Sequence, residues 1–226
     1  MADQTGAAGH PADAGNPHGG QPLLAAGEPL EQARAALLML HGRGASAEDI
    51  LSFVGELAQP GFAFVAPQAS GHEWYPYSFL APLEANEPYL SSALALLDRA
   101  LSHIAAAGVV PERVMILGFS QGACLGLEYA ARRARRYAGV VGWTGGLIGP
   151  DDAPRDYPGS LAGTPVFIGS SDVDPHVPLA RVELTAAALQ RLGGDVTTRI
   201  YPRMPHTVNA DEITFVQGMM RAVVGG

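Results

Sequence analysis

The chain has 226 residues, of which 47% are hydrophobic and 16% charged, and its formal net charge at pH 7 is −8. This length suits one α/β domain with a single core. The acidic balance argues against a nucleic-acid partner, which usually demands a basic surface. We expect no membrane span, because no apolar run approaches the ~20 residues required, and no secretory signal at the start.

Residues 1–21 are rich in Gly, Ala, Pro and His and nearly devoid of bulky apolar side chains. This composition predicts a disordered segment, followed by a single domain over residues 22–226. His10 and His18 lie in the segment, and two scattered histidines are too little to predict a metal site, so we expect none.

From Leu23 onward, short apolar runs typical of buried strands alternate with segments of helical pattern. Ser46 and Asp49 have the spacing of a capping box, and Asn86 is expected to start a helix. Strands are expected over 35–40, 62–66, 114–117, 139–144, 165–168 and 196–201, and helices over 46–59, 87–107, 123–130, 177–192 and 209–223. The alternation predicts a mostly parallel sheet with helices on both faces and active residues at the carboxyl ends of its strands.

The stretch Gly118-Phe119-Ser120-Gln121-Gly122 fits the G-x-S-x-G nucleophile elbow. A predicted strand precedes it and a helical pattern follows it, which is the order that an elbow requires. Such a turn exposes the serine hydroxyl above the sheet, beside unpaired N–H groups of the helix. The sequence therefore predicts Ser120 as a catalytic nucleophile. The competing interpretation is a glycine-rich turn with an incidental serine.

Cys124 lies one helical turn beyond the elbow and is the single cysteine. An intrachain disulfide is therefore excluded, and a cytoplasmic location is favoured. We expect Cys124 to be a small core residue rather than a second nucleophile.

A serine nucleophile needs a base to accept its proton. Only His176 and His206 follow Ser120 in the chain, and α/β-hydrolases have the order nucleophile, acid, histidine. His206 lies between the last predicted strand and the last predicted helix, where a histidine reaches the elbow. His176 lies within the loop expected to supply the acid. We therefore predict His206 as the base, against the alternative of a surface histidine that caps a helix.

The acid is expected in the loop after the strand predicted over 165–168, which contains Asp172 and Asp174. A carboxylate beside the imidazole fixes its tautomer and stabilises the imidazolium. Both aspartates qualify by position, and spacing alone does not choose between them.

The oxyanion that forms when a serine attacks a carbonyl group needs hydrogen-bond donors. One is expected from the backbone N–H of Gln121, directly after the nucleophile. The other is expected from the loop after an early strand, where the backbone N–H of Arg43 is the candidate. His41 precedes Ser120 and lies in the same glycine-rich loop, so we expect it to shape the loop rather than take part in the chemistry.

These segments together resemble the phospholipase/carboxylesterase family, which includes the acyl-protein thioesterases. The matching segments, in family order, are Leu40-His41-Gly42, Ala66-Pro67, Gly118-Phe119-Ser120-Gln121-Gly122, Asp174-Pro175-His176-Val177-Pro178 and Met204-Pro205-His206. The family pattern selects Asp174 as the acid and leaves Asp172 as a turn residue. The resemblance implies an α/β-hydrolase fold with a minimal cap, ester hydrolysis without a cofactor and, often, a cytosolic homodimer.

Two features depart from the better-known family members: Arg43 stands where an apolar residue is common, and residues 74–80 are unusually aromatic. One hypothesis is an apolar acyl groove, and the alternative is that the aromatic side chains pin a long loop to the core. The predicted substrate-binding residues are Trp74, Tyr75, Phe79, Leu147 and Ile148. A second hypothesis is that the Arg43 guanidinium points to solvent and attracts an anionic substrate group.

The predicted function is a serine carboxylesterase that acts on small-molecule esters with short to medium acyl chains through Ser120, His206 and Asp174. The alternatives are an acyl-protein thioesterase or lysophospholipase with the same machinery, and a hydrolase-like binding protein without catalysis.

Overall fold

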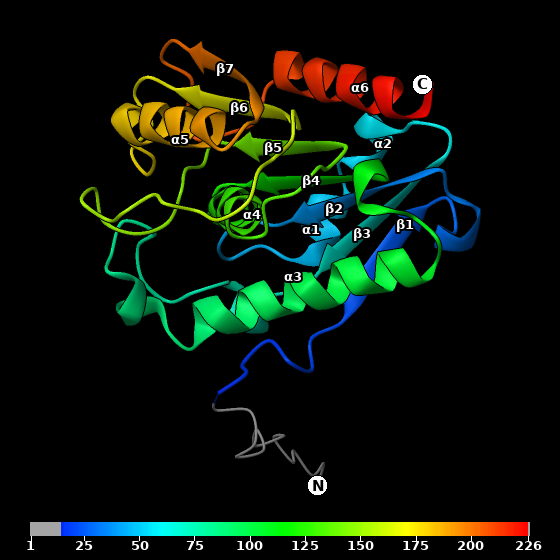
Figure 1. Ribbon diagram of the computed structural model, residues 1–226, viewed down its shortest axis with the longest axis horizontal. Helices are drawn as coiled ribbons and strands as arrows, with labels where there is room; N and C mark the ends of the chain where they lie inside the picture. Colours follow the sequence, from blue (N-terminus) through cyan, green and yellow to red (C-terminus); the bar gives the residue numbers. More distant parts are fainter. Residues whose placement is uncertain (1–14, 226) are drawn as a thin grey trace, which may run out of the picture.

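The structure, a computed structural model, describes residues 15–225 and contains a seven-stranded sheet (Figure 1). The strand order is β1-β3-β2-β4-β5-β6-β7, in which β1 is antiparallel to β3 and all other neighbours are parallel. The strands are β1 (Leu23–Gly27), β2 (Ala35–Leu40), β3 (Phe62–Pro67), β4 (Val114–Phe119), β5 (Gly139–Trp143), β6 (Pro165–Ser171) and β7 (Asp195–Tyr201). The mostly parallel sheet is the architecture predicted from the alternating pattern.

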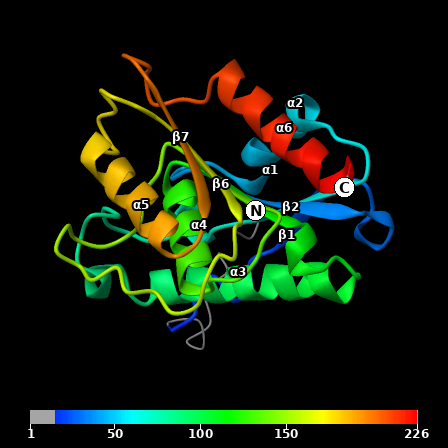
Figure 2. The same ribbon diagram turned by 45° about the horizontal axis from the view of Figure 1, so that its top comes forward.

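Helices cover both faces of the sheet, as Figures 1 and 2 show from two sides. On one face lie α3 (Tyr89–Ala106), α4 (Gln121–Arg132) and α5 (Leu179–Arg191); on the other lie α1 (Ala47–Leu51), α2 (Val54–Leu57) and α6 (Ala210–Gly225). The short 3-10 helices are η2 (Leu30–Gln32), η3 (Ser70–His72), η4 (Leu83–Asn86) and η5 (Pro111–Arg113). β2 and β3 are buried throughout, as expected of strands covered on both sides. Within the described residues, no helix is both long and apolar enough to cross a membrane.

The helix predicted over 46–59 is instead two short helices, α1 and α2. Its start agrees with the sequence: Asp49 N–H donates to Ser46 Oγ (3.2 Å), and Ser46 N–H donates to Asp49 Oδ2 (2.8 Å). In a continuing helix, the Asp49 carbonyl would accept from the N–H of Phe53, four residues later. The Ser52 hydroxyl donates to this carbonyl (2.6 Å) and competes for it. Phe53 N–H turns to the Ile50 carbonyl instead (3.3 Å), and the helix breaks there.

Asn86 does not start the next helix, which begins only at Tyr89. The Asn86 side chain faces residues 74–80, the aromatic segment. Its Oδ1 accepts from Tyr77 N–H (2.9 Å) and its Nδ2 donates to Ser78 O (3.1 Å). Asn86, predicted to cap a helix, therefore stabilises the loop that contains Tyr77 and Ser78.

Residues 15–21 pack on the domain, in contrast to the disorder expected for them, whereas residues 1–14, including His10, lie outside the described residues. His18 is fully buried, and its backbone N–H donates to Ser92 Oγ (2.8 Å). Its Nδ1 accepts from Ser70 N–H (3.0 Å), so Nε2 carries the proton and donates to Trp74 O (3.0 Å). Both ring nitrogens are therefore in use, and residues 15–225 contain no group of three metal-ligating side chains.

The carboxyl ends of β2, β4, β6 and β7 lie at one edge of the sheet, because these strands are parallel. The turns that follow them contain residues 41–45, Ser120, residues 172–178 and residues 202–209. Segments that are more than 150 positions apart in the chain therefore meet where active residues of such sheets collect.

Glu212, in the first turn of α6, is a fully buried carboxyl. It lies against β6, since a Cβ at Gly169 would be 2.0 Å from Glu212 Oε1. Oε2 accepts from Asn209 N–H (2.9 Å), but Oε1 has no hydrogen-bond partner among the described residues. Burial is the main cause that raises the pKa of Glu212 to about 7. The folded state therefore binds a proton here more tightly than the unfolded chain does.

We expect the Glu212 carboxyl to stabilise the fold fully below its unfolded pKa, and this contribution to be lost as pH rises through about 7. Glu212→Gln keeps an oxygen acceptor for Asn209 N–H and removes the ionisation. The free energy of unfolding of the variant minus that of the wild type should be larger at pH 8.5 than at pH 4.5, by about 2–4 kcal/mol. Urea unfolding at both pH values measures this, with the exposed Glu183→Gln as the control. An equal difference at both pH values would contradict the expectation.

Candidate active site

Ser120 lies at the turn between β4 and α4 with φ 54° and ψ −118°, a conformation that residues other than glycine rarely adopt. Its N–H donates to Trp143 O (2.9 Å), and its carbonyl accepts from Cys124 N–H (3.0 Å). A Cβ at Gly118 would lie 2.2 Å from Gly122 O, and a Cβ at Gly122 would lie 2.3 Å from a carbonyl oxygen of β2. Both glycines are therefore needed for α4 to begin so close to the sheet.

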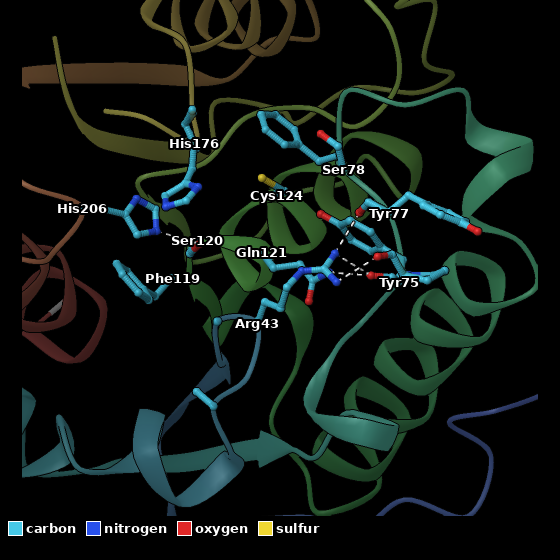
Figure 3. A pocket seen from close by; sticks show the side chains of 15 residues that line it. Arg43, Tyr75, Tyr77, Ser78, Phe119, Ser120, Gln121, Cys124, His176 and His206 are labelled. Atoms are coloured by element: carbon cyan, nitrogen blue, oxygen red, sulfur yellow. Dashed lines mark hydrogen bonds between the residues drawn. The ribbon is translucent and has the colours of Figure 1, made fainter. Parts of the chain in front are cut away.

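A chain of two hydrogen bonds joins three side chains from three separate turns. His206 Nε2 lies 2.8 Å from Ser120 Oγ, and His206 Nδ1 lies 2.7 Å from Asp174 Oδ2 (Figure 3 shows the first contact). Because a carboxylate only accepts, Nδ1 carries the proton and Nε2 is free to accept from the serine hydroxyl. The His206 ring is held between Phe119 (ring centroids 5.2 Å apart) and the edge-on ring of His176 (4.8 Å).

Asp174 is the aspartate that the structure places beside the imidazole, and its side chain is 0% exposed. Its Oδ1 accepts from the backbone N–H groups of His176 (2.8 Å) and Val177 (2.9 Å). Burial alone would raise the pKa of Asp174, but the hydrogen bonds from His206 and from these two N–H groups outweigh it and hold the pKa below its usual value. The carboxyl is therefore ionised at neutral pH.

The turn that carries His206 is held at both of its ends. Asp172 Oδ1 accepts from Arg203 N–H (2.7 Å), which ties the turn to the loop after β6. At the other end, Asn209 Oδ1 accepts from Glu212 N–H (3.0 Å) while Glu212 Oε2 accepts from Asn209 N–H (2.9 Å), a reciprocal cap at the start of α6. Asn209 therefore caps α6, and the His206 side chain is left to face Ser120.

The two proposed oxyanion donors, Arg43 and Gln121, lie at the cavity beside Ser120. Gln121 opens α4, and the first N–H groups of a helix have no partner within it. Arg43 belongs to the loop that follows β2, whose backbone passes close to Gly122.

His41, two residues before Arg43, is fully buried and lies outside the hydrogen-bond chain. Its Nε2 accepts from Ala69 N–H (3.1 Å), so Nδ1 carries the proton and donates to Gly42 O (2.8 Å). Burial is the main cause that lowers the pKa of His41, so the ring stays neutral. It therefore shapes the loop from which Arg43 projects.

The Arg43 guanidinium binds the backbone of the aromatic segment instead of pointing freely to solvent (Figure 3). Nη1 donates to Glu73 Oε2 (2.5 Å) and Pro76 O (2.9 Å), and Nη2 donates to Tyr75 O (2.8 Å) and Tyr77 O (2.8 Å). These bonds use all four N–H groups at the end of the side chain. The arrangement disfavours the hypothesis that this side chain attracts an anionic substrate, because its terminal donors are already engaged.

The Gln121 side chain holds the same segment from α4. Its Oε1 accepts from Trp74 N–H (2.9 Å), and its Nε2 donates to Tyr75 O (2.7 Å). Trp74 is fully buried, and its indole N–H donates to His41 O (2.8 Å). Sequence reasoning missed these roles of Gln121, because a bond from a side chain to a backbone 46 positions away has no local pattern.

A cavity of about 530 Å³ opens at Ser120. Of the predicted substrate-binding residues, Tyr75 and Phe79 line it, whereas three others are fully buried and do not: Trp74, Leu147 and Ile148. Its wall also includes side chains that the sequence analysis did not assign to substrate: Tyr77, Ser78, Phe119, Cys124, His176 and Val177. Trp74 thus pins the loop to the core, whereas Tyr75 and Phe79 line the cavity.

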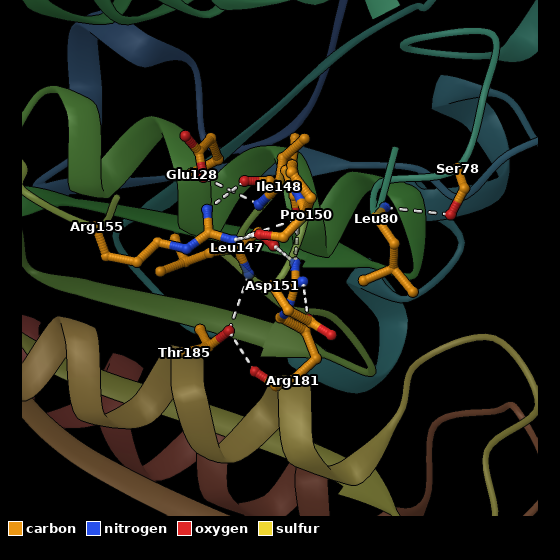
Figure 4. Close-up of polar contacts among 11 residues, drawn as sticks. Ser78, Leu80, Glu128, Leu147, Ile148, Pro150, Asp151, Arg155, Arg181 and Thr185 are labelled. Carbon is orange, nitrogen blue, oxygen red and sulfur yellow. Dashed lines mark hydrogen bonds and ion pairs between the residues drawn. The ribbon is translucent and has the colours of Figure 1, made fainter. Parts of the chain in front are cut away.

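Leu147 and Ile148 belong to a loop after β5 that is anchored by buried polar side chains (Figure 4). Leu147 N–H donates to Thr185 Oγ1 (2.9 Å), and Ile148 N–H donates to Glu128 Oε2 (3.0 Å). Arg181, also buried, donates to Leu147 O (2.7 Å), and its guanidinium lies 5.6 Å from the ring centre of Phe79. The loop therefore supports the cavity wall from behind.

Comparison with known proteins agrees with this geometry. A crystal structure of a phospholipase/carboxylesterase from Dyadobacter fermentans DSM 18053 is 44% identical, with a TM-score of 0.86 over 88% of this chain and 96% of that one. Acyl-protein thioesterase 1 of Gibberella zeae is 32% identical over 123 residues, which are 50% of this chain and 49% of that protein. A Salmonella typhi protein provisionally named a carboxymethylenebutenolidase is 31% identical over 175 residues, 73% of this chain and 64% of that protein.

The aligned part of this chain thus spans about half the length of the thioesterases that it matches. Residues 24–224 match the family described as Phospholipase/Carboxylesterase, which covers nearly all of the described structure. The fold is that of the α/β-hydrolases, as the motifs predicted. The chain belongs to the phospholipase/carboxylesterase family of hydrolases.

Proposed function

We propose that this hydrolase is a serine esterase that cleaves esters of short to medium acyl chains through an acyl-enzyme on Ser120. The observation that carries the proposal is the continuous hydrogen-bond chain from Ser120 through His206 to a buried, ionised Asp174 at the rim of a cavity. This is the geometry in which an imidazole activates a serine and a carboxylate orients the imidazole.

In the proposed reaction, His206 Nε2 takes the hydroxyl proton while Ser120 Oγ bonds to the ester carbonyl carbon. The negative oxygen of the tetrahedral intermediate accepts from the backbone N–H groups of Gln121 and Arg43. The intermediate then expels the alcohol, which receives the proton from His206, and the acyl group stays on Ser120. Water attacks the acyl-enzyme with the same base, releases the carboxylic acid and restores the serine hydroxyl.

The size and lining of the cavity support short to medium acyl chains. Its volume of about 530 Å³ lies within the range of small-molecule sites. Phe79, Phe119 and Val177 give it apolar walls, and Tyr75 and Cys124, both buried, line its inner part.

A second candidate is thioester hydrolysis with the same residues, which the likeness to the Gibberella zeae thioesterase favours, or lysophospholipid hydrolysis, which the family's description as Phospholipase/Carboxylesterase favours. Parallel rates on acyl thioesters, lysophosphatidylcholine and p-nitrophenyl esters decide between the two. The likeness to the Salmonella typhi protein suggests dienelactone hydrolysis as a third candidate. Enzymes of that kind usually have a cysteine at the elbow, where this chain has Ser120. Burial raises the pKa of the nearby Cys124 thiol to about 12, so it offers no thiolate at neutral pH.

Ser120→Ala should lower kcat/KM on p-nitrophenyl butanoate by a factor on the order of 10⁴–10⁶, because it removes the nucleophile. It should also abolish covalent labelling by a fluorophosphonate probe. Ser102→Ala, which removes a hydroxyl on the surface of α3, is the matched control and should keep wild-type rate and labelling. Turnover by Ser120→Ala at the wild-type rate would refute the assignment.

The two aspartates of the loop after β6 form a matched pair for testing the acid. Asp174→Asn should lower kcat by a factor on the order of 10³–10⁴, because an amide does not hold the imidazole in the required tautomer. Asp172→Asn keeps an oxygen acceptor for Arg203 N–H and loses only the negative charge, so its rate should stay within about fivefold of wild type. Steady-state kinetics on one ester compare them, and equal losses would contradict the assignment of Asp174.

Arg43→Leu should lower kcat/KM on neutral esters by about 10–100-fold, because the loop that carries one proposed oxyanion donor loses its ties to residues 73–77. The preference between p-nitrophenyl pentanoate and the p-nitrophenyl monoester of succinic acid should not change. A selective loss of the anionic ester, with the neutral ester unaffected, would instead restore the role of Arg43 in attracting anions.

A further inference from the structure

The inner part of the cavity contains a polar group that the proposed reaction does not use. Tyr75 is 1% exposed and lines the cavity, and its hydroxyl oxygen has no hydrogen-bond partner among residues 15–225. The Cys124 thiol lies beside this hydroxyl, is at most a weak hydrogen-bonding neighbour for it, and also lines the cavity. A buried hydroxyl without a partner costs about 1–3 kcal/mol, which a bound acceptor would recover.

Tyr75 and Cys124 form the floor of the cavity, and the position of this floor relative to Ser120 determines which part of a substrate reaches it. The alcohol oxygen of the ester must approach His206 Nε2 to receive its proton, so the alcohol lies on the side of His206 and His176. Figure 3 shows Tyr75 and Cys124 on the other side of Ser120, toward which the acyl chain must then run. Cys124 follows Ser120 by four residues, a rise of about 6 Å along α4, which is about the reach of the third or fourth carbon of an acyl chain.

The charges around the floor favour an uncharged acceptor. Burial, first of all, raises the pKa of Tyr75 well above its usual value and that of Cys124 to about 12, so both groups keep their protons. Glu128 lies near both and opposes a buried anion. The two nearby cations are engaged: Arg43 binds residues 73–77, and Arg181 binds Leu147 O, Gly149 O and Asp151.

We propose that Tyr75 and Cys124 form an acceptor-binding subsite, and that the preferred substrates are esters of short acids with an uncharged carbonyl or hydroxyl oxygen on the third or fourth carbon. The Tyr75 hydroxyl donates to that oxygen. This inference rests on the proposed function, since it assumes acyl transfer to Ser120. Plain acyl esters remain substrates, but they leave the Tyr75 hydroxyl unpaired.

The test compares p-nitrophenyl 4-oxopentanoate with p-nitrophenyl 4-methylpentanoate, which differ by a carbonyl oxygen in place of a methyl group. Each kcat/KM is divided by the hydroxide-catalysed rate of the same ester. The wild type should prefer the oxo ester by about 5–20-fold, and Tyr75→Phe should bring this ratio to about one. The matched control is Tyr137→Phe, which loses a buried hydroxyl that donates to Arg133 O (2.9 Å) and should keep the wild-type ratio.

An oxo-to-methyl ratio of one in the wild type, or the same raised ratio in Tyr75→Phe, overturns the subsite. The wild-type ratio needs no variant, so it remains decisive if Tyr75→Phe fails to fold. Failure of the proposed function is a different result: neither ester is hydrolysed, and the fluorophosphonate probe does not label Ser120. A wild type that is labelled and hydrolyses both esters equally well contradicts only the subsite.

Discussion

The close passage of α4 over the end of β2 is the constraint on which the site depends. A Cβ at Gly122 would meet Leu40 O at 2.3 Å and His41 O at 2.5 Å, so the helix start and the loop after β2 touch backbone to backbone. Ser120, with φ 54°, lies two residues before this contact, and Arg43 and Gln121 line the same cavity. Every other part of the site is positioned relative to this turn, including the imidazole that arrives from the far end of the chain.

The aromatic segment has no regular secondary structure, and side chains from other elements supply the bonds that a helix or sheet would provide. Arg43 binds three of its carbonyls, Gln121 binds Trp74 N–H and Tyr75 O, and Asn86 binds Tyr77 N–H. Two of these three side chains come from the segments that also carry the proposed oxyanion donors. The cavity wall and the proposed oxyanion donors are therefore parts of one hydrogen-bonded unit, and in the proposed reaction this unit couples the choice of acyl chain to the geometry at Ser120.

Much of the fold and the placement of the candidate site could be predicted from the sequence, because strand runs, the elbow and the positions of Ser120 and His206 have local or ordered signatures. The family resemblance, carried by those motifs, is confirmed by the match over residues 24–224. Asp172 and Asp174 could not be separated by spacing, since both follow β6 and both accept hydrogen bonds, one from Arg203 N–H and the other from the imidazole. The role of the Arg43 side chain and the packing of residues 15–21 were missed, because both depend on bonds to distant backbone that leave no periodic pattern.

His18 gives the segment ahead of β1 a part in shaping the pocket wall. Its ring satisfies Ser70 N–H and Trp74 O at either end of a 3-10 turn, and its backbone binds the long helix α3. A recombinant chain trimmed to begin at Leu23 would leave both groups without these partners, next to a buried indole. Purification tags are therefore best joined ahead of residue 15, so that the His18 contacts behind the pocket wall are kept.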